Sequence, residues 1–318
     1  MTASVSGWGC GSRMRTLLFR TVRRGALALV LLAIGSASLW AAWNVADFRL
    51  QAADDLLVQA ALGELHTVDD PSQRLHTAAR WFLDQPYRLD PMGEACGSDT
   101  DPLYTWEQVD CITMLEVLLG FVYADTPQKA RELTLKLRYD GDASQWNNRR
   151  HFTLAQWLPG AVELGLLHDI TPQLAGTDVK TAKKKWSRTA SCKGRWKTFC
   201  KRMGERFPET TVSFNYWPIK QAIDDYRRLP AGSMIFFLHT PRPSVPYQVF
   251  HAGVIGHDAR GLPTLIHASK KAGKVLEVNA GAYLASLPER HKKWPVAAVL
   301  VYAPPAPGSL PQTPRVTN

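Results

Sequence analysis

The segment DCITMLE (residues 110–116) carries a cysteine out of a polar loop and into the first turn of an apolar helix. The apolar run continues to about Val122, so the sequence predicts a buried helix with Cys111 at its start. Backbone N–H groups and the helix dipole at this position favour the thiolate, which is the form of cysteine that attacks a carbonyl carbon. The alternative is a buried structural cysteine, the commoner fate of a single Cys.

Two of the nine histidines are candidates for the base that a cysteine nucleophile needs. His251 lies in VFHAGVI (249–255) and His267 in LIHAS (265–269), and both segments have the small and apolar residues of strands. A hairpin between these strands would place the two imidazoles side by side. Together with Cys111 they would supply a nucleophile, a base and an orienting group. For each histidine taken alone, a satisfied core or surface residue is the alternative.

Helix signals dominate the first half of the chain and strand signals the second. Helices are predicted over 44–64, from the N-cap Asp70 to about Gln85, from Cys111 to about Val122, from Thr126-Pro127 to Arg138 and over 153–166, with a loop at 88–108. Strands are predicted at 209–216, 233–239, 248–256, 263–268, 274–278 and 295–302. This order predicts an α+β domain in which helices pack against an antiparallel sheet.

The start of the chain is typical of an export signal. A basic region ending at Arg23-Arg24 precedes the uncharged apolar stretch 25–43. That stretch is close to the roughly 17–25 residues that span a bilayer, so residues 1–46 are predicted to be a cleaved signal peptide or an inner-membrane signal anchor. The preceding positive charge predicts a periplasmic or exported location. Residues 47–302 are then expected to form one domain, and the proline-rich residues 303–318 a disordered tail.

Basic residues outnumber acidic ones by 38 to 28, which suits an anionic polymer as partner. They concentrate at 178–206, an insert with Trp186 and Trp196 between its lysines and arginines. This insert is predicted to contact an anionic envelope polymer or lipid, with a solvated loop as the alternative. Basic runs with aromatic residues also suit nucleic acid, but export argues against that partner.

The cysteine spacing fits an exported protein. Cys192 and Cys200 are close enough in sequence to bridge in an oxidising compartment. The absence of a CxxC pair argues against a structural zinc site, and no metal or cofactor is expected.

Several motifs, in this order, resemble the NlpC-type papain-like cysteine peptidases: Pro86-Tyr87, Asp110-Cys111, FHAG (250–253) and IHAS (266–269). More closely, the chain resembles their N-acetylmuramoyl-L-alanine amidase-like branch, long described only as a domain of unknown function. Asp140-Gly141 followed by NRRHF (148–152) and Trp157 resembles the branch pattern Asp-Gly…Ser-Arg-x-His-Tyr…Trp. LPAGS (229–233) resembles its Pro-x-Gly-Asp lead into the first core strand. The resemblance covers roughly residues 70–302 without the insert, and Asn148 and Ser233 depart from it.

The resemblance implies a papain-like, NlpC-type fold in which the Cys111 helix packs against the sheet that carries both histidines. It implies that Cys111 is the nucleophile, that His251 is the general base and acid, and that His267 orients the imidazole. Tyr87 would help the Cys111 backbone N–H to stabilise the oxyanion. Arg149 and His151 would line the substrate side, with packing as an equal alternative.

The implied function is an exported cell-wall hydrolase that cleaves the N-acetylmuramoyl-L-alanine amide bond of peptidoglycan or muropeptides. A first alternative keeps the same catalytic residues but cleaves the bond between D-glutamate and the diamino acid of the stem peptide. A second alternative is a non-catalytic envelope protein, in which the insert binds an anionic polymer and Cys111 is merely buried.

Overall fold

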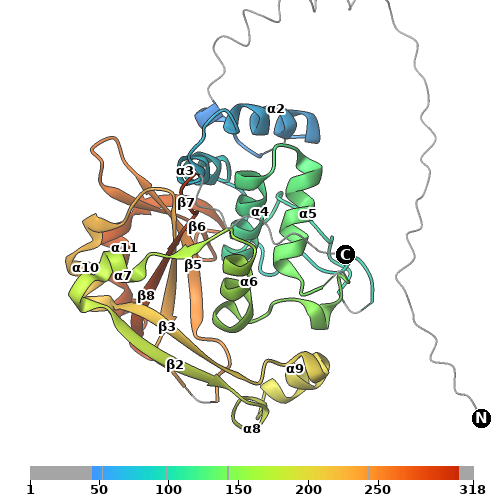
Figure 1. The fold of residues 1–318 in the computed structure, drawn as a ribbon, viewed down its shortest axis with the longest axis vertical. Helices are drawn as coiled ribbons and strands as arrows, with labels where there is room; N and C mark the ends of the chain where they lie inside the picture. The colour runs from blue at the N-terminus through green and yellow to red at the C-terminus, as the bar shows by residue number, and fades with distance from the viewer. Residues whose placement is uncertain (1–44, 52, 98, 142, 243, 308–318) are drawn as a thin grey trace, which may run out of the picture.

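A computed structural model describes residues 45–307 except Ala52, Ser98, Asp142 and Pro243 (Figure 1). Nearly all of the predicted signal or anchor, and residues 308–318 of the predicted tail, therefore lie outside the described residues. Within the described part of the chain, no helix is long and apolar enough to cross a membrane.

An antiparallel sheet with helices on both faces forms the centre of the molecule (Figure 1). Its strand order is β2-β3-β8-β4-β5-β6-β7, and the short β1 also pairs with β8. The strands are β1 His168–Asp169, β2 Lys180–Trp186, β3 Thr210–Pro218, β4 Ser233–His239, β5 Val249–His257, β6 Pro263–Ser269, β7 Lys274–Asn279 and β8 Val296–Ala303. The α+β class and the six predicted strands are confirmed, with their ends placed to within two residues.

The helices divide between the two faces of the sheet. The longer ones are α2 Asp55–Leu65, α3 Pro71–Trp81, α4 Cys111–Tyr123, α5 Pro127–Arg138 and α11 Ala280–Arg290. The shorter ones are α6 Leu158–Glu163, α7 Thr171–Ala175, α8 Arg188–Ser191, α9 Trp196–Met203 and α10 Ile219–Asp224. Single turns lie at Val45–Asp47, Trp146–Asn148, Gly176–Asp178, Gly204–Arg206 and Tyr226–Arg228, and Thr153–Trp157 is a π-helix.

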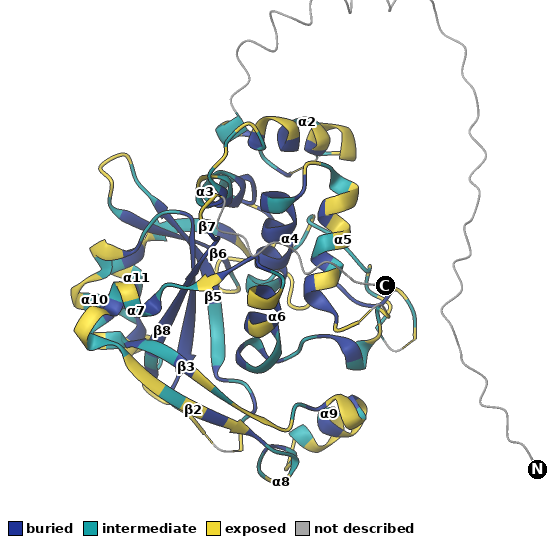
Figure 2. Ribbon diagram, viewed as in Figure 1, coloured by how far each residue is buried: buried dark blue, intermediate teal, exposed yellow. Residues whose placement is uncertain are grey.

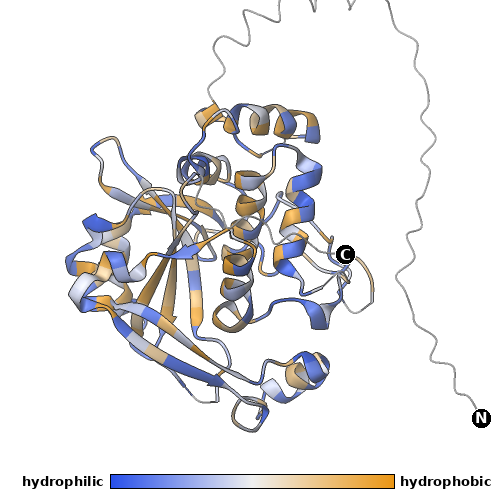
Figure 3. Cartoon of the chain, in the orientation of Figure 1, coloured by the Kyte–Doolittle hydropathy of each residue, from blue (hydrophilic) through white to orange (hydrophobic). Residues whose placement is uncertain are grey.

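Two apolar cores result. The larger core includes α3, α4 and one face of the sheet, and the smaller core lies beneath α10 and α11 on the other face. Figure 2 shows the central strands and most of α4 as buried, whereas α2, α9 and β2 carry exposed residues. In Figure 3 the central strands are mostly hydrophobic and β2 is mostly hydrophilic. The central position of α4 follows from its sequence, because its residues from Thr113 to Val122 are all buried.

Capping residues explain where the predicted helices begin. The Asp70 side chain accepts the Ser72 N–H, and the Thr126 side chain accepts the Lys129 N–H, so α3 and α5 begin as predicted. Helix α3 ends at Trp81, four residues before the predicted end, and the chain then turns through Asp84 with a φ of 68°.

Two further helix predictions were wrong in extent. The predicted helix over 44–64 is interrupted, because Asp54 caps a new helix and the preceding residues bury Phe48 and Leu50 in the core. The predicted helix over 153–166 is shorter and begins as a π-helix.

The basic insert is a folded extension of the sheet. Strand β2 pairs with β3 along its whole length, from Lys180 opposite Tyr216 to Trp186 opposite Thr210. Helices α8 and α9 follow, and a Cys192–Cys200 disulfide joins the end of α8 to α9. The bridge that the cysteine spacing allowed is therefore present, and the insert forms a strand and two short helices rather than a loop.

Candidate active site

A capping box fixes the first turn of α4 and so the position of Cys111. The Asp110 carboxylate accepts hydrogen bonds from the N–H groups of Ile112 at 3.0 Å and Thr113 at 2.9 Å. The Thr113 hydroxyl accepts one in return from the Asp110 N–H at 2.8 Å. Cys111 is partly exposed at this end of an otherwise buried helix.

Desolvation dominates the electrostatics of the Cys111 thiol. Burial raises the pKa of Cys111 to about 12, and the neighbouring Asp110 carboxylate raises it further. Hydrogen bonds from the backbone of Ala252, Cys111 and Ile112 act in the opposite direction. The predicted stabilisation of a thiolate at the helix start is therefore present but outweighed, and the resting form is the neutral thiol. The Ala252 interaction also brings Cys111 against β5.

The two predicted histidines meet across β5 and β6. The His251 Nε2 and His267 Nδ1 atoms are 2.8 Å apart, so the expected side-by-side arrangement is confirmed. The strands pair from Val254 opposite Ile266 onward, so His267 directly follows the first paired residue of β6 and His251 lies three residues before that of β5. A Cβ at Gly253 would lie 2.7 Å from the Ile266 carbonyl oxygen, so the motif needs glycine between the histidine and the paired part of β5.

Both imidazoles are uncharged at neutral pH. Burial lowers the pKa of His251 to about 3 and that of His267 to about 4, and the Arg290 cation lowers the pKa of both. The Phe237 ring stacks on the His251 ring at a centroid distance of 5.9 Å and an angle of 18°. The His251 ring is thus held by a stacked phenyl ring and by its hydrogen bond to His267.

Tyr87 lies beside the nucleophile, as the sequence predicted. It forms an isolated parallel bridge with Val109, and its N–H donates to the Gly273 carbonyl at 2.8 Å. Burial, Asp110 and Cys111 together raise the pKa of Tyr87 to about 12. The phenol therefore keeps its proton and can donate a hydrogen bond.

The sequence did not identify Tyr283 and Arg290, which lie on α11. The Tyr283 ring centroid is 5.1 Å from that of His267 and 6.2 Å from that of His251. The Arg290 guanidinium lies over the Tyr283 ring at 5.3 Å. The seven-residue spacing that puts both on one helix face was available in the sequence, but only after a helix had been assigned there.

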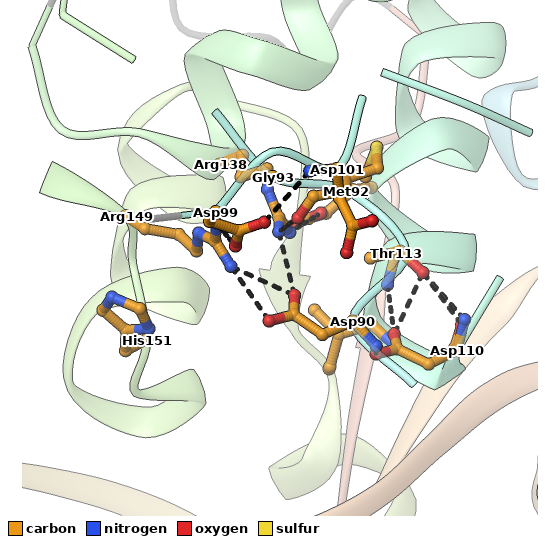
Figure 4. Close-up of polar contacts among 12 residues, drawn as sticks. Asp90, Met92, Gly93, Asp99, Asp101, Asp110, Thr113, Arg138, Arg149 and His151 are labelled. Carbon is orange, nitrogen blue, oxygen red and sulfur yellow. Dashed lines mark hydrogen bonds and ion pairs between the residues drawn. The ribbon is translucent and has the colours of Figure 1, made fainter. Parts of the chain in front are cut away.

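Arg149 is buried within a cluster of carboxylates. Its guanidinium contacts Glu94 at 2.6 Å, Asp99 at 2.8 Å and Asp90 at 3.1 Å, and its side chain is 6% exposed. Figure 4 shows the Arg149 guanidinium between Asp90 and Asp99. All polar groups of the guanidinium face carboxylates of the loop 88–108. A structural role for Arg149, the alternative to substrate binding, therefore accounts for these contacts.

A pocket of about 220 Å³ lies beside the first turn of α4. Its lining residues include Asp90, Asp110, Ile112, Thr113, Arg149, His151 and Tyr247. Both residues that were predicted to line the substrate side, Arg149 and His151, are thus on its wall. A larger hollow of about 690 Å³ lies between the loop 104–107 and α5, and the lining of neither hollow includes Cys111, His251 or His267.

His151 is held as a neutral ring in this wall. Its Nε2–H donates to the Trp146 carbonyl at 2.8 Å, and its ring packs against those of Trp146 and Phe199. Burial lowers its pKa to about 3. Among residues 45–307, apart from the four positions without a description, no group of three or more His, Cys, Asp or Glu side chains could hold a metal ion.

Comparison with known proteins adds a family relationship. A family model described as AmiA-like, N-acetylmuramoyl-L-alanine amidase-like, matches residues 77–289. No curated protein matches the chain in sequence.

Solved structures share the fold at low sequence identity. A Legionella pneumophila protein from a domain family of unknown function is 18% identical with a TM-score of 0.66, over 79% of this chain and 95% of that one. An N-acetylmuramoyl-L-alanine amidase from Bacteroides uniformis is 19% identical with a TM-score of 0.57, over 73% and 98%. A putative xylanase from Bacteroides fragilis is 20% identical with a TM-score of 0.54, over 71% and 99%.

Proposed function

The chain belongs to the AmiA-like, N-acetylmuramoyl-L-alanine amidase-like family, and on that premise we propose that it is a cysteine hydrolase of peptidoglycan. We propose that it cleaves the amide bond between N-acetylmuramic acid and L-alanine. The observation that carries the proposal is the placement of Cys111, at the start of α4, against the backbone of Ala252, the residue that follows His251 of the hydrogen-bonded pair His251 and His267. The chain order, a helix that carries the cysteine followed by two strands that carry the histidines, also supports the proposal that the fold is papain-like and of the NlpC type.

The hydrogen bond between the imidazoles suggests which nitrogen acts as the base. If the His251 Nε2–H donates to the His267 Nδ1, the His251 Nδ1 lone pair is left to accept the thiol proton. His267 then carries its own proton on Nε2. This assignment gives His267 an orienting role and stabilises the imidazolium that forms on His251.

Acylation then proceeds from a neutral thiol and a neutral imidazole. The Cys111 sulfur attacks the lactyl carbonyl carbon while its proton passes to the His251 Nδ1. The imidazolium returns that proton to the leaving amine of L-alanine as the C–N bond breaks, which leaves a thioester on Cys111. A water molecule, deprotonated by His251, attacks the thioester, and proton return to the sulfur releases the acid and restores the thiol.

The oxyanion that forms during each attack needs hydrogen-bond donors. The Cys111 backbone N–H and the Tyr87 hydroxyl are proposed for this role, because the Tyr87 phenol lies next to Cys111 and keeps its proton. Tyr87→Phe is expected to lower kcat about 10²-fold with KM changed by less than about threefold, since the lost bond forms only in the transition state. Steady-state kinetics on a soluble muropeptide measures both values.

The control for Tyr87 is Tyr216→Phe on β3, a strand that carries none of the candidate catalytic residues, which should leave kcat within about twofold. A rise in KM at unchanged kcat for Tyr87→Phe would instead place Tyr87 in substrate binding.

The bond that is cut can be read directly from the products. We expect the purified protein to convert a disaccharide-peptide into free stem peptide and peptide-free disaccharide, each identified by mass spectrometry, with Cys111→Ala as the blank. A disaccharide that keeps L-alanine and D-glutamate would move the function to the endopeptidase. No product from the wild-type protein on several wall types would overturn the enzyme proposal.

The proposed substrate also fits a location outside the cytoplasm. Peptidoglycan lies there, and the basic and apolar pattern of residues 1–43 is typical of export. The proposal therefore includes an exported or periplasmic protein.

A further inference from the structure

Residues 180–206, which form β2, α8 and α9, are termed here the basic arm. Its inner face is anchored to the segment before β5. The Trp186 indole N–H donates to the Pro246 carbonyl at 3.0 Å, and the Lys184 ammonium donates to the Val245 carbonyl at 3.2 Å. Trp186 is buried in the larger core, so β2 has one packed face and one free face.

Helix α9 forms the layer behind the pocket of about 220 Å³ at the first turn of α4. The Phe199 ring lies 5.2 Å from that of His151 and 6.1 Å from that of Tyr247, and the Trp196 ring lies 5.2 Å from that of Tyr247. Both His151 and Tyr247 line that pocket. The disulfide between Cys192 and Cys200 ties α8 to α9, and the ring contacts of α9 hold the arm against this pocket wall.

The outer face of the arm carries cations without acidic partners. Lys183 and Lys185 alternate with the buried Lys184 and Trp186, so they share the outer face of β2. The residues opposite them on β3 are Ser213 and Thr211, which are uncharged.

The helices of the arm continue this charge. Lys193 precedes α9, and Lys197 and Lys201 are one turn apart on it. All three are exposed, as are the two outer lysines of β2. None of these five lysines forms a salt bridge with another of the described residues.

We propose that the outer face of the basic arm binds the carboxylates of the stem peptides in polymeric peptidoglycan and so holds the pocket against the insoluble wall. This inference rests on the proposed function. A polymer that repeats its carboxylates suits a set of several unpaired lysines, because each contact is weak and their number supplies the affinity. Lysine on an edge strand also blocks edge-to-edge pairing, but that role does not account for Lys193 before α9 or for Lys197 and Lys201 on α9.

Two observations favour the wall over a lipid surface. The large exposed apolar side chains of the described residues are Leu56, Leu57, Leu89 and Val162, and none of them lies on the arm, which therefore lacks the residues that insert into a bilayer. The arm is also at the opposite end of the domain from α2, near which the described chain begins (Figure 1).

Binding can be measured without hydrolysis. The test is co-sedimentation of the full chain, carrying Cys111→Ala, with purified insoluble peptidoglycan at low and at high salt. In this background, Lys→Gln at 183, 185, 193, 197 and 201 removes five charges from the arm. The matched control removes five charges elsewhere, at Lys129, Lys136, Lys220, Arg260 and Lys292, all of which are exposed.

We expect the arm variant to bind at least about tenfold more weakly and the control to bind within about twofold of the parent, with high salt weakening only the parent and the control. Equal binding by the two variants would overturn the proposal. Binding of the parent to anionic phospholipid vesicles but not to peptidoglycan would assign the arm to a membrane instead. A double variant, Lys197→Gln with Lys201→Gln, gives a milder loss if the five-fold variant unfolds.

Activity separates this inference from the proposed function. With Cys111 intact, the arm variant should hydrolyse a small soluble muropeptide within about twofold of the wild-type rate but lose about tenfold on intact peptidoglycan. Equal losses on both substrates would overturn the arm proposal. Absence of hydrolysis by the wild type would overturn the proposed function, whereas the binding result would still decide the role of the arm.

Discussion

Cys111→Ala is expected to lower the rate of amide hydrolysis by at least about 10⁴-fold, because the thioester cannot form without the sulfur. Initial rates on a soluble muropeptide, measured by mass spectrometry over hours, give the range needed. The fold should survive, because the substitution keeps a small side chain at a partly exposed helix start and leaves the Asp110 cap in place. The free energy of unfolding should therefore change by less than about 1 kcal/mol.

Cys96 provides the matched control. It lies half-exposed in the loop 88–108, and Cys96→Ala should leave the rate within about twofold. His251→Ala should lower the rate of hydrolysis nearly as much as Cys111→Ala. The double variant should be no slower than either single variant, because the effects of residues that act as a unit are not additive. A Cys111→Ala rate above about one hundredth of wild type would rule out nucleophilic catalysis by this residue.

The neutral resting state has a consequence for this experiment. Burial raises the pKa of Cys111 to about 12 and lowers that of His251 to about 3, so the substrate-free pair holds a thiol and an uncharged imidazole. Alkylation of Cys111 at neutral pH is then a weaker sign of catalysis than it is for a preformed thiolate. Rates of hydrolysis are the better measure.

Local signals determined much of the fold from the sequence. Helices α3, α4 and α5 begin directly after the N-caps Asp70, Asp110 and Thr126, because each of these side chains accepts a backbone N–H of the first turn. Strands β4 to β8 were found because their apolar runs end at glycine and proline turns. The proximity of the two histidines could also be predicted from the sequence, since a short hairpin leaves few possible registers for its two strands.

Elements that depend on distant partners were missed. Strand β2 has four lysines among seven residues, a composition that strands disfavour, and it forms because β3 pairs with it and Trp186 fills a gap in the core. Helix α11 contains Pro288, which reads as a helix breaker. Without α11, Tyr283 and Arg290 could not be placed near the imidazoles.

The partners of Arg149 could not be predicted either, because they are distant from it in the sequence. The acidic residues that surround it lie 50 to 59 positions earlier in a loop without regular structure. Nothing local distinguishes these carboxylates from the other acidic residues of that loop. The loop is ordered through them, and the Asp90 N–H donates to the Asp110 carboxylate at 2.9 Å, so the cluster also holds the N-cap of the Cys111 helix.

Arg149→Met is expected to lower the free energy of unfolding by about 3 kcal/mol or more, because it leaves Glu94 buried without its cation. The Glu94 side chain is 5% exposed and that of Asp99 is 17% exposed, so water cannot replace the guanidinium there. Asp90 is 55% exposed, so its ion pair with Arg149 should contribute little to the free energy of unfolding. Denaturant unfolding, followed by circular dichroism, measures the change.

Arg260→Met is the matched control, because its partner Asp258 lies in an exposed turn and the arginine side chain is 78% exposed. Its loss should cost less than about 1 kcal/mol. If Arg149→Met unfolds like the wild type but raises KM more than about tenfold, the guanidinium contacts substrate and the packing role is wrong. If stability and kcat fall together, the carboxylate cluster acts on catalysis through the chain Arg149, Asp90 and Asp110, since the last of these caps the helix that presents the nucleophile.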